Sequence, residues 1–168
     1  MNSQLFINIF RFVLLILLQA AVLNNINFLG YINPYIYILF IILLPVNIGR
    51  GQVIFYGFLL GLSIDFFADS GGVNAAACLV ISYLRPFLLK SSFGLGYDHQ
   101  TLKFSKISFK ERFVYVSTMV FIHHFVLFSL ETFSFLSILF ILEKTLFSGI
   151  FSIILILIVM ILFGKREK

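Results

Sequence analysis

Charged side chains are scarce in this sequence. Of its 168 residues, only 11% are Asp, Glu, Lys or Arg, whereas 61% are apolar. An ordinary soluble domain is about 25% charged, so the composition excludes a soluble globular protein. The apolar residues extend from Leu5 to Phe163, and the mean hydropathy is +1.08. We therefore expect a single polytopic membrane domain over residues 1–168.

Cysteine is almost absent as well. The single Cys78 can form no internal disulfide and cannot build a metal cluster alone, so it is expected to be a small buried residue. The sequence also lacks a nucleophile paired with a base, a Gly-rich phosphate loop and an exposed acid pair, which predicts no enzyme, no metal and no cofactor. The net charge of +5 does not indicate nucleic-acid binding, because the basic residues lie where membrane topology puts them.

What the sequence has instead is a series of long apolar runs. A membrane-spanning helix needs about 20 apolar residues. Six runs fit, at residues 5–23, 33–48, 52–68, 73–89, 113–130 and 146–163. The first is interpreted as a helix rather than a signal peptide, because more hydrophobic spans follow it. We expect an all-α integral membrane protein, a bundle of about six transmembrane helices.

The second run carries two prolines. We expect its helix to start at Asn33-Pro34, because Asn caps helices and Pro is tolerated in the first turn. Pro45 is expected to bend or end this helix.

Two segments leave alternatives open. Residues 91–112 are polar and basic, with Lys103, Lys106 and Lys110 on one helical face. They form either an interfacial segment on anionic lipid or a solvated loop whose lysines only set orientation. Residues 132–142 are apolar but too short to cross alone, so they either lie along the outer interface or extend a long, tilted last helix.

The positive charges predict the orientation of the chain. Lysine and arginine are concentrated at Arg50, over residues 90–112 and in the tail 165–168, whereas the loops at 24–33 and 69–72 carry none. Only Lys144 breaks this pattern. By the positive-inside rule both termini are cytoplasmic, which agrees with an even number of spans.

One stripe in the third span is unusual. Gly57, Gly61, Asp65 and Asp69 follow one another at intervals of four residues, so they share one face of a helix. The glycines allow another helix to approach closely. A carboxylate in an apolar span is costly and indicates a task, and the expected task is contact with another helix.

The two carboxylates of this stripe have different expected roles. We expect Asp65 to have a structural or partner-binding role rather than to act in a proton relay, since matching ionisable groups at its depth are not found. Asp69, at the outer boundary, is expected to be an exposed helix end that can cap the next helix.

Four further polar residues lie in the apolar spans and have expected structural roles. Arg85 precedes Pro86 near the inner end of the fourth span, too deep to pair with Asp65, and is expected to snorkel to the inner headgroups. Adjacent His123 and His124 point about 100° apart, so they cannot share a ligand site and are expected to join helices as neutral polar groups. Asn74, followed by three alanines, suits close helix packing.

An ordered series of motifs resembles the rod shape-determining protein MreD family. The motifs are Asn33-Pro34-Tyr35-Ile36-Tyr37 ending in Leu43-Leu44-Pro45, then Gly57-x-x-x-Gly61-x-x-x-Asp65 followed by Gly71-Gly72-Val73-Asn74-Ala75-Ala76-Ala77, then Tyr83-Leu84-Arg85-Pro86. The resemblance covers roughly residues 28–89. The last two spans match the family only in size and hydropathy.

The resemblance implies a small multi-pass protein of the bacterial cytoplasmic (inner) membrane that belongs to the cell-elongation machinery. It would bind MreC, and through MreC it would sit with the polymerase RodA, its penicillin-binding transpeptidase and, indirectly, MreB. It also implies a fold similar to the six-helix substrate-binding subunits of energy-coupling-factor vitamin transporters.

Two functions follow as hypotheses from this resemblance. The first is a scaffold in which Gly57 and Gly61 make close backbone contact and Asp65 is satisfied by a partner or a neighbouring helix. The alternative is a transporter binding subunit, in which Asp65 and Asn74 line a ligand cavity near the outer face. The residues that we single out for packing or partner contact are Pro34, Gly57, Gly61, Asp65, Asp69, Asn74 and Arg85.

Overall fold

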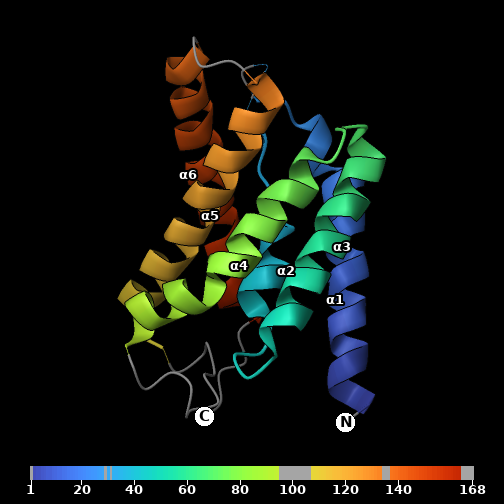
Figure 1. The fold of residues 1–168 in the computed structure, drawn as a ribbon, viewed down its shortest axis with the longest axis vertical. Helices are drawn as coiled ribbons and strands as arrows, with labels where there is room; N and C mark the ends of the chain where they lie inside the picture. The colour runs from blue at the N-terminus through green and yellow to red at the C-terminus, as the bar shows by residue number, and fades with distance from the viewer. Residues whose placement is uncertain (1, 29, 31, 95–106, 134–136, 164–168) are drawn as a thin grey trace.

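The fold is a bundle of helices. The computed structural model describes residues 2–28, 30, 32–94, 107–133 and 137–163, and over these ranges it contains no β-strand. Five long helices form the bundle (Figure 1): α1 Asn2–Ala21, α3 Arg50–Ala68, α4 Val73–Phe93, α5 Phe109–Thr132 and α6 Ile138–Phe163. Each is long and apolar enough to cross a membrane, so the chain is a multi-pass helical membrane protein.

Helices α3 to α6 pack in the order of the sequence, each against the next, and α1 lies against α3. α1 begins and α6 ends at the same end of the bundle, the lower end in Figure 1. We call this the terminal end. The opposite end, where α3 meets α4 and α5 meets α6, is the far end.

The second expected span differs from the prediction. Instead of a helix over 33–48, the structure has the six-residue helix α2, Ile38–Leu43. The helix does not begin at Asn33-Pro34, because the Asn33 side chain bonds to Asn27 instead of capping a helix. Pro45 does end it, with Leu44 already in an extended conformation (φ −55°, ψ 144°).

The chain nevertheless passes from the far end to the terminal end between residues 33 and 49 (Figure 1). It does so in an extended segment, the short helix α2 and a second irregular segment. Ile38, Leu39, Phe40, Ile41 and Ile42 are all buried. A short helix that is apolar on every side belongs in the interior of a bundle rather than against lipid, and α2 is the centre of the hydrophobic core.

The two open segments have different outcomes. Of residues 132–142, Thr132 ends α5, residues 134–136 lie outside the described residues, and residues 138–142 form the start of α6, so the last helix begins earlier than the predicted span. Lys103 and Lys106 of the basic segment lie outside the described residues. Lys110 lies in the first turn of α5, which begins with a capping box between Ser108 and Glu111.

Candidate functional site

The interior of the bundle holds many polar side chains. Each is costly in a membrane unless it has a partner, so their partners indicate what the interior does. The buried polar residues are Gln19, Asp65, Asn74, Ser82, Arg85, His123, His124, Thr145, Ser148 and Ser152.

Asp65 caps the helix that follows its own. The N-cap of α4 is Gly72, which has no side chain to offer to the first free amides. Asp65 takes over this role from the preceding helix: its Oδ1 accepts from the backbone amide of Asn74 (3.0 Å) and its Oδ2 from that of Ala75 (2.8 Å). The negative charge also lies at the positive end of the α4 dipole.

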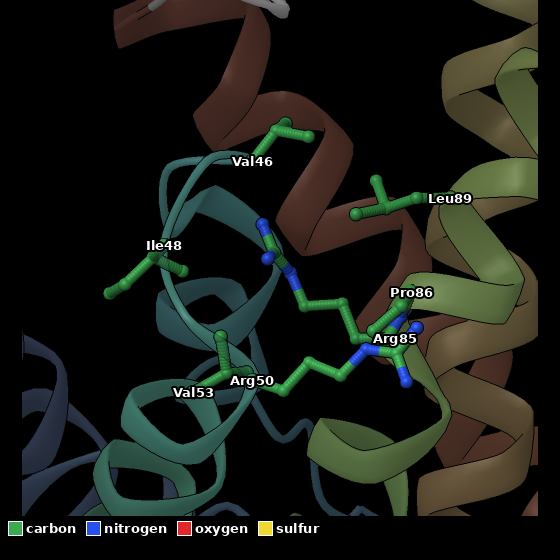
Figure 2. Close-up of a pocket in the computed structure, with 7 residues that line it drawn as sticks. All are labelled: Val46, Ile48, Arg50, Val53, Arg85, Pro86 and Leu89. Carbon is green, nitrogen blue, oxygen red and sulfur yellow. The ribbon is translucent and has the colours of Figure 1, made fainter. Parts of the chain in front are cut away.

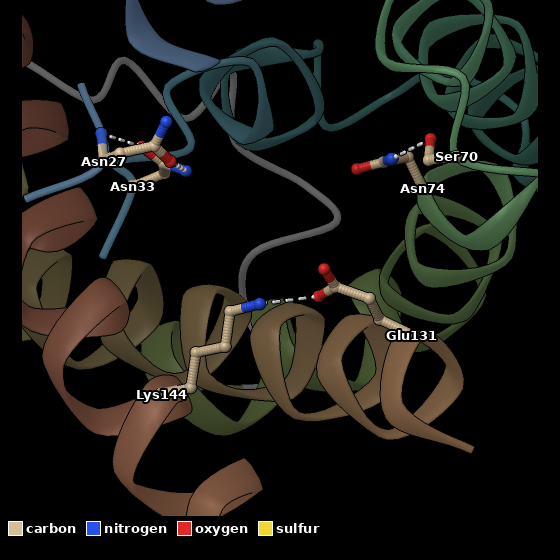
Figure 3. A network of polar contacts seen from close by, with 6 residues as sticks. All are labelled: Asn27, Asn33, Ser70, Asn74, Glu131 and Lys144. Carbon is tan, nitrogen blue, oxygen red and sulfur yellow. Dashed lines mark hydrogen bonds and ion pairs between the residues drawn. The ribbon is translucent and has the colours of Figure 1, made fainter. Parts of the chain in front are cut away.

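Two side chains complete the shell around this carboxylate. The hydroxyl of Ser70 donates to Oδ1 of Asp65 at 2.6 Å, and the side-chain amide of Asn74 donates to the same oxygen at 2.9 Å. The Asn74 amide also donates to Ser70 at 2.9 Å, a contact drawn in Figure 3. Asp65 is thereby satisfied within the chain by four donors.

The glycines of the same stripe bring α3 and α4 together. A Cβ on Gly61 would lie 2.5 Å from the Cα of Ala75 and 2.6 Å from the carbonyl oxygen of Asn74, both of which are backbone atoms. A Cβ on Gly57 would collide with the hydroxyl of Ser82. The helix that this stripe contacts is therefore α4 of the same chain.

Asp69 lies apart from this contact. It is the exposed C-cap of α3, in the left-handed conformation (φ 49°, ψ 43°). This matches the expected exposed helix end, but the next helix is capped by Asp65 rather than by Asp69.

A chain of hydrogen bonds continues from Asn74 into the bundle. The Tyr37 hydroxyl lies 2.7 Å from Oδ1 of Asn74 and 3.0 Å from Nε2 of His123. Because the Asn74 amide hydrogens are given to Asp65 and Ser70, its Oδ1 faces Tyr37 and can only accept. Tyr37 therefore donates to Asn74, and His123 must donate to Tyr37 from Nε2.

His124 takes a different direction. Its Nδ1 lies 2.8 Å from the carbonyl oxygen of Val120, and its Nε2 lies 3.1 Å from the hydroxyl of Ser152 on α6. The two adjacent histidines thus reach different partners, as their 100° separation predicted. Within the described ranges no group of three or more His, Cys, Asp or Glu residues could hold a metal ion.

The extended segment before α2 is fixed from two sides. Gln19 of α1 donates to the carbonyl of Pro34 (3.0 Å) and accepts from the amide of Ile36 (2.9 Å). Ser152 of α6 accepts from the amide of Tyr35 (2.8 Å). These bonds satisfy backbone groups that a continuous helix would have paired internally.

Arg85 corrects a prediction. Instead of reaching the headgroups, its side chain is only 2% exposed, and it donates to the carbonyls of Leu44 and Pro45 (3.4 Å to Pro45). These carbonyls follow the end of α2, where the helix leaves acceptors unpaired. The prediction failed because the acceptors are created by the early end of α2. Asp65 and Arg85 do not pair: one lies near the end of α3 at the far end, the other near the end of α4.

Lys144, the exception to the charge pattern, is neutralised locally. Its ammonium group lies 2.9 Å from Glu131 across the α5–α6 contact (Figure 3) and 4.5 Å from the centre of the Phe128 ring. The pair adds no net charge to the far end.

Four residues of this network were not predicted from the sequence: Gln19, Tyr37, Ser70 and Ser152. For Gln19 a signal existed, since a lone amide in an apolar span is costly unless it is paired. Tyr37 lies in the first motif of the resemblance, but nothing in the sequence predicts its hydrogen bonds, and nothing marks Ser152 among its apolar neighbours.

Comparison with models of protein families, with curated proteins and with solved structures finds no match for this chain in any of the three.

Proposed function

We propose that this chain is a non-enzymatic membrane scaffold of the bacterial cell-elongation machinery, with the role that the MreD-like motifs imply. It binds an MreC-like single-span protein and, through it, cell-wall synthases such as RodA and its transpeptidase. The observation that carries the proposal is that the buried polar side chains form hydrogen bonds that hold the helices of the bundle together. Asp65, Asn74 and Arg85 each bond to groups of the same chain.

The three motifs of the resemblance supply contacts that hold the elements of the bundle together. The first contains Pro34 and Pro45, on either side of α2. The second supplies the α3–α4 contact at Gly61, and the third supplies Arg85, which bonds to the carbonyl of Pro45 in the first. A chain selected for a rigid shape on which partners assemble needs such internal ties.

The alternative function gains less support. In a transporter binding subunit Asp65 and Asn74 would offer their polar atoms to a ligand. Here Asp65 accepts from Asn74 twice, and the carbonyl oxygen of the Asn74 side chain accepts from Tyr37. A ligand at this place would have to break these bonds.

The proposal also includes a location, the cytoplasmic membrane with both termini inside. It is supported by the distribution of basic residues. Arg50 starts α3, Lys90 lies in the last turn of α4, and Lys110 starts α5, all at the terminal end. At the far end Lys144 is paired with Glu131.

The test is a pull-down of the tagged chain from its native membrane in mild detergent, followed by mass spectrometry. We expect an MreC-like protein and cell-wall synthases to be enriched over a tagged, unrelated multi-pass protein of similar abundance. Gly61→Leu, which disrupts the α3–α4 contact, should lose these partners, and Gly51→Leu in the same helix should retain them, because a Cβ at Gly51 meets nothing within 4 Å.

Two other results would refute the scaffold. One is recovery of ATPase subunits or of a bound small molecule without cell-wall proteins, which would favour the transporter function. The other is equal partner recovery by Gly61→Leu and wild type, which would show that partner binding does not depend on the bundle that the motifs hold together.

A further inference from the structure

A pocket of about 200 Å³ lies at the terminal end of the bundle. It is formed by the segment before α3, the start of α3 and the last part of α4. Its lining residues are Val46, Ile48, Arg50, Val53, Arg85, Pro86 and Leu89. Five of the seven are apolar, and the two polar ones are both arginines. Figure 2 shows that the two arginine side chains enter the pocket from opposite sides, Arg50 from α3 and Arg85 from α4.

Neither arginine has a described counter-charge. Among the residues that the structure describes, Asp65, Asp69, Glu131 and Glu143 lie at or near the far end, and Glu111 accepts from Ser108 in the cap of α5. Two cations that line one pocket repel each other, and an anion between them reverses the sign of that interaction.

The positive charge of Arg85 is also almost completely buried. Its terminal nitrogens donate to the carbonyls of residues 44 and 45, and the Tyr115 hydroxyl also interacts with the guanidinium, so neutral polar groups surround this almost fully buried side chain. Carbonyl dipoles satisfy part of the guanidinium and leave its net charge in place. A buried charge without a counter-ion is costly, so the pocket is an incomplete environment for Arg85.

The chemistry of the two side chains selects the anion. Guanidinium groups bind oxyanions such as phosphate through paired, charge-assisted hydrogen bonds. The valine, isoleucine and leucine side chains beside them suit the apolar part of an ester. The pocket lies at the end of the bundle, the level at which phospholipid headgroups meet a spanning helix, and basic pockets between helices bind such headgroups.

We propose that Arg50 and Arg85 form a phosphate-binding site. The bound group is a phosphate oxyanion, carried either by an anionic phospholipid or by free phosphate. Both arginines supply donors to this oxyanion. This site is independent of the scaffold function and does not require a protein partner.

The test uses the full-length protein in a neutral detergent. Native mass spectrometry and thermal unfolding are measured with added phosphatidylglycerol, with added phosphatidylcholine and with inorganic phosphate. Arg50→Gln is the main variant because Arg50 is exposed and has no structural bond to lose. Lys90→Gln is its matched control, an exposed cation in the last turn of α4 at the same end but outside the pocket.

We expect phosphatidylglycerol to be retained and to raise the unfolding temperature of wild type and Lys90→Gln. Arg50→Gln should bind it about tenfold more weakly, since one charge-assisted contact is large enough for such a factor. If inorganic phosphate alone gives the same pattern, the site is one for free phosphate.

The proposal is wrong if neither phosphatidylglycerol nor phosphate stabilises the wild type more than phosphatidylcholine does. It is equally wrong if Arg50→Gln and Lys90→Gln lose binding to the same extent, because that result shows attraction to overall charge and not to a pocket.

Discussion

The backbone amide and the side-chain amide of Asn74 donate to the same carboxylate oxygen of Asp65, at 3.0 and 2.9 Å. These two hydrogen bonds join the end of α3 to the start of α4 and fix the turn between the helices. Because Gly72 offers no cap, the start of α4 depends on a residue from the preceding helix.

Asp65→Asn should therefore destabilise the protein. An amide has one acceptor oxygen, and its NH₂ group would face donors, so at least one bond to the carboxylate is lost. A hydrogen bond to a charged group is worth about 1.5–3 kcal/mol, and we expect a loss of this size in unfolding titrations in mixed micelles. Asp69→Asn is the control: Asn tolerates the left-handed conformation at this exposed cap, so its stability should equal that of wild type. Equal stability of both variants would contradict the capping role of Asp65.

The close contact of α3 with α4 makes a second prediction. Gly61→Ala places a methyl group 2.5 Å from a backbone carbon of α4, so the helices must move apart. Overpacking of this kind costs about 1–3 kcal/mol. Gly51→Ala, in the same helix, meets no atom within 4 Å and should be neutral or slightly stabilising because alanine favours helix. Thermal unfolding followed by size-exclusion chromatography measures both. If Gly61→Ala unfolds at the same temperature as Gly51→Ala, the helices can move apart without loss of stability.

The Tyr37 hydroxyl joins Asn74 to His123 by one hydrogen bond to each. Tyr37→Phe leaves the buried Oδ1 of Asn74 without this donor, which costs about 1–3 kcal/mol, and leaves Nε2 of His123 with its long contact to the Cys78 sulfur (3.9 Å). We expect a clear fall in unfolding temperature. Tyr83→Phe, at a tyrosine that is 73% exposed, should leave the temperature unchanged. If the unfolding temperature falls by a similar amount in both variants, the effect of removing the hydroxyl does not depend on this hydrogen-bond network.

The orientation can be tested with single cysteines, because the natural Cys78 is fully buried and can be replaced by Ala. In that background Asn25→Cys lies at the far end and Lys110→Cys at the terminal end. A membrane-impermeant maleimide should label Asn25→Cys in intact cells and Lys110→Cys only after permeabilisation. The reverse result would invert the orientation expected from the positive-inside rule.

The sequence predicted the parts of the fold that depend on neighbouring residues. Gly57, Gly61 and Asp65 share a face because of a period of four, and the short turn after Asp69 leaves α4 as a natural neighbour. The helical membrane class followed from composition alone.

The second crossing could not be predicted in this way. Residues 33–48 have the length and hydropathy of a spanning helix. What shortens the helix is the competition for its backbone groups by Gln19 and Ser152, which lie far away in the sequence. The error for Arg85 has the same origin, because its carbonyl acceptors exist only when α2 ends at Leu43.

The interrupted crossing also constrains how the protein enters the membrane. The amide of Tyr35 finds its acceptor on Ser152, which is 117 residues later in the chain. Lipid offers no substitute for this acceptor, so the Tyr35 amide lacks it in the bilayer until α6 is present, whereas Pro34 and Ile36 can already bond to Gln19 of α1. We therefore expect the segment around Tyr35 to reach its final position only after the last helix has been synthesised.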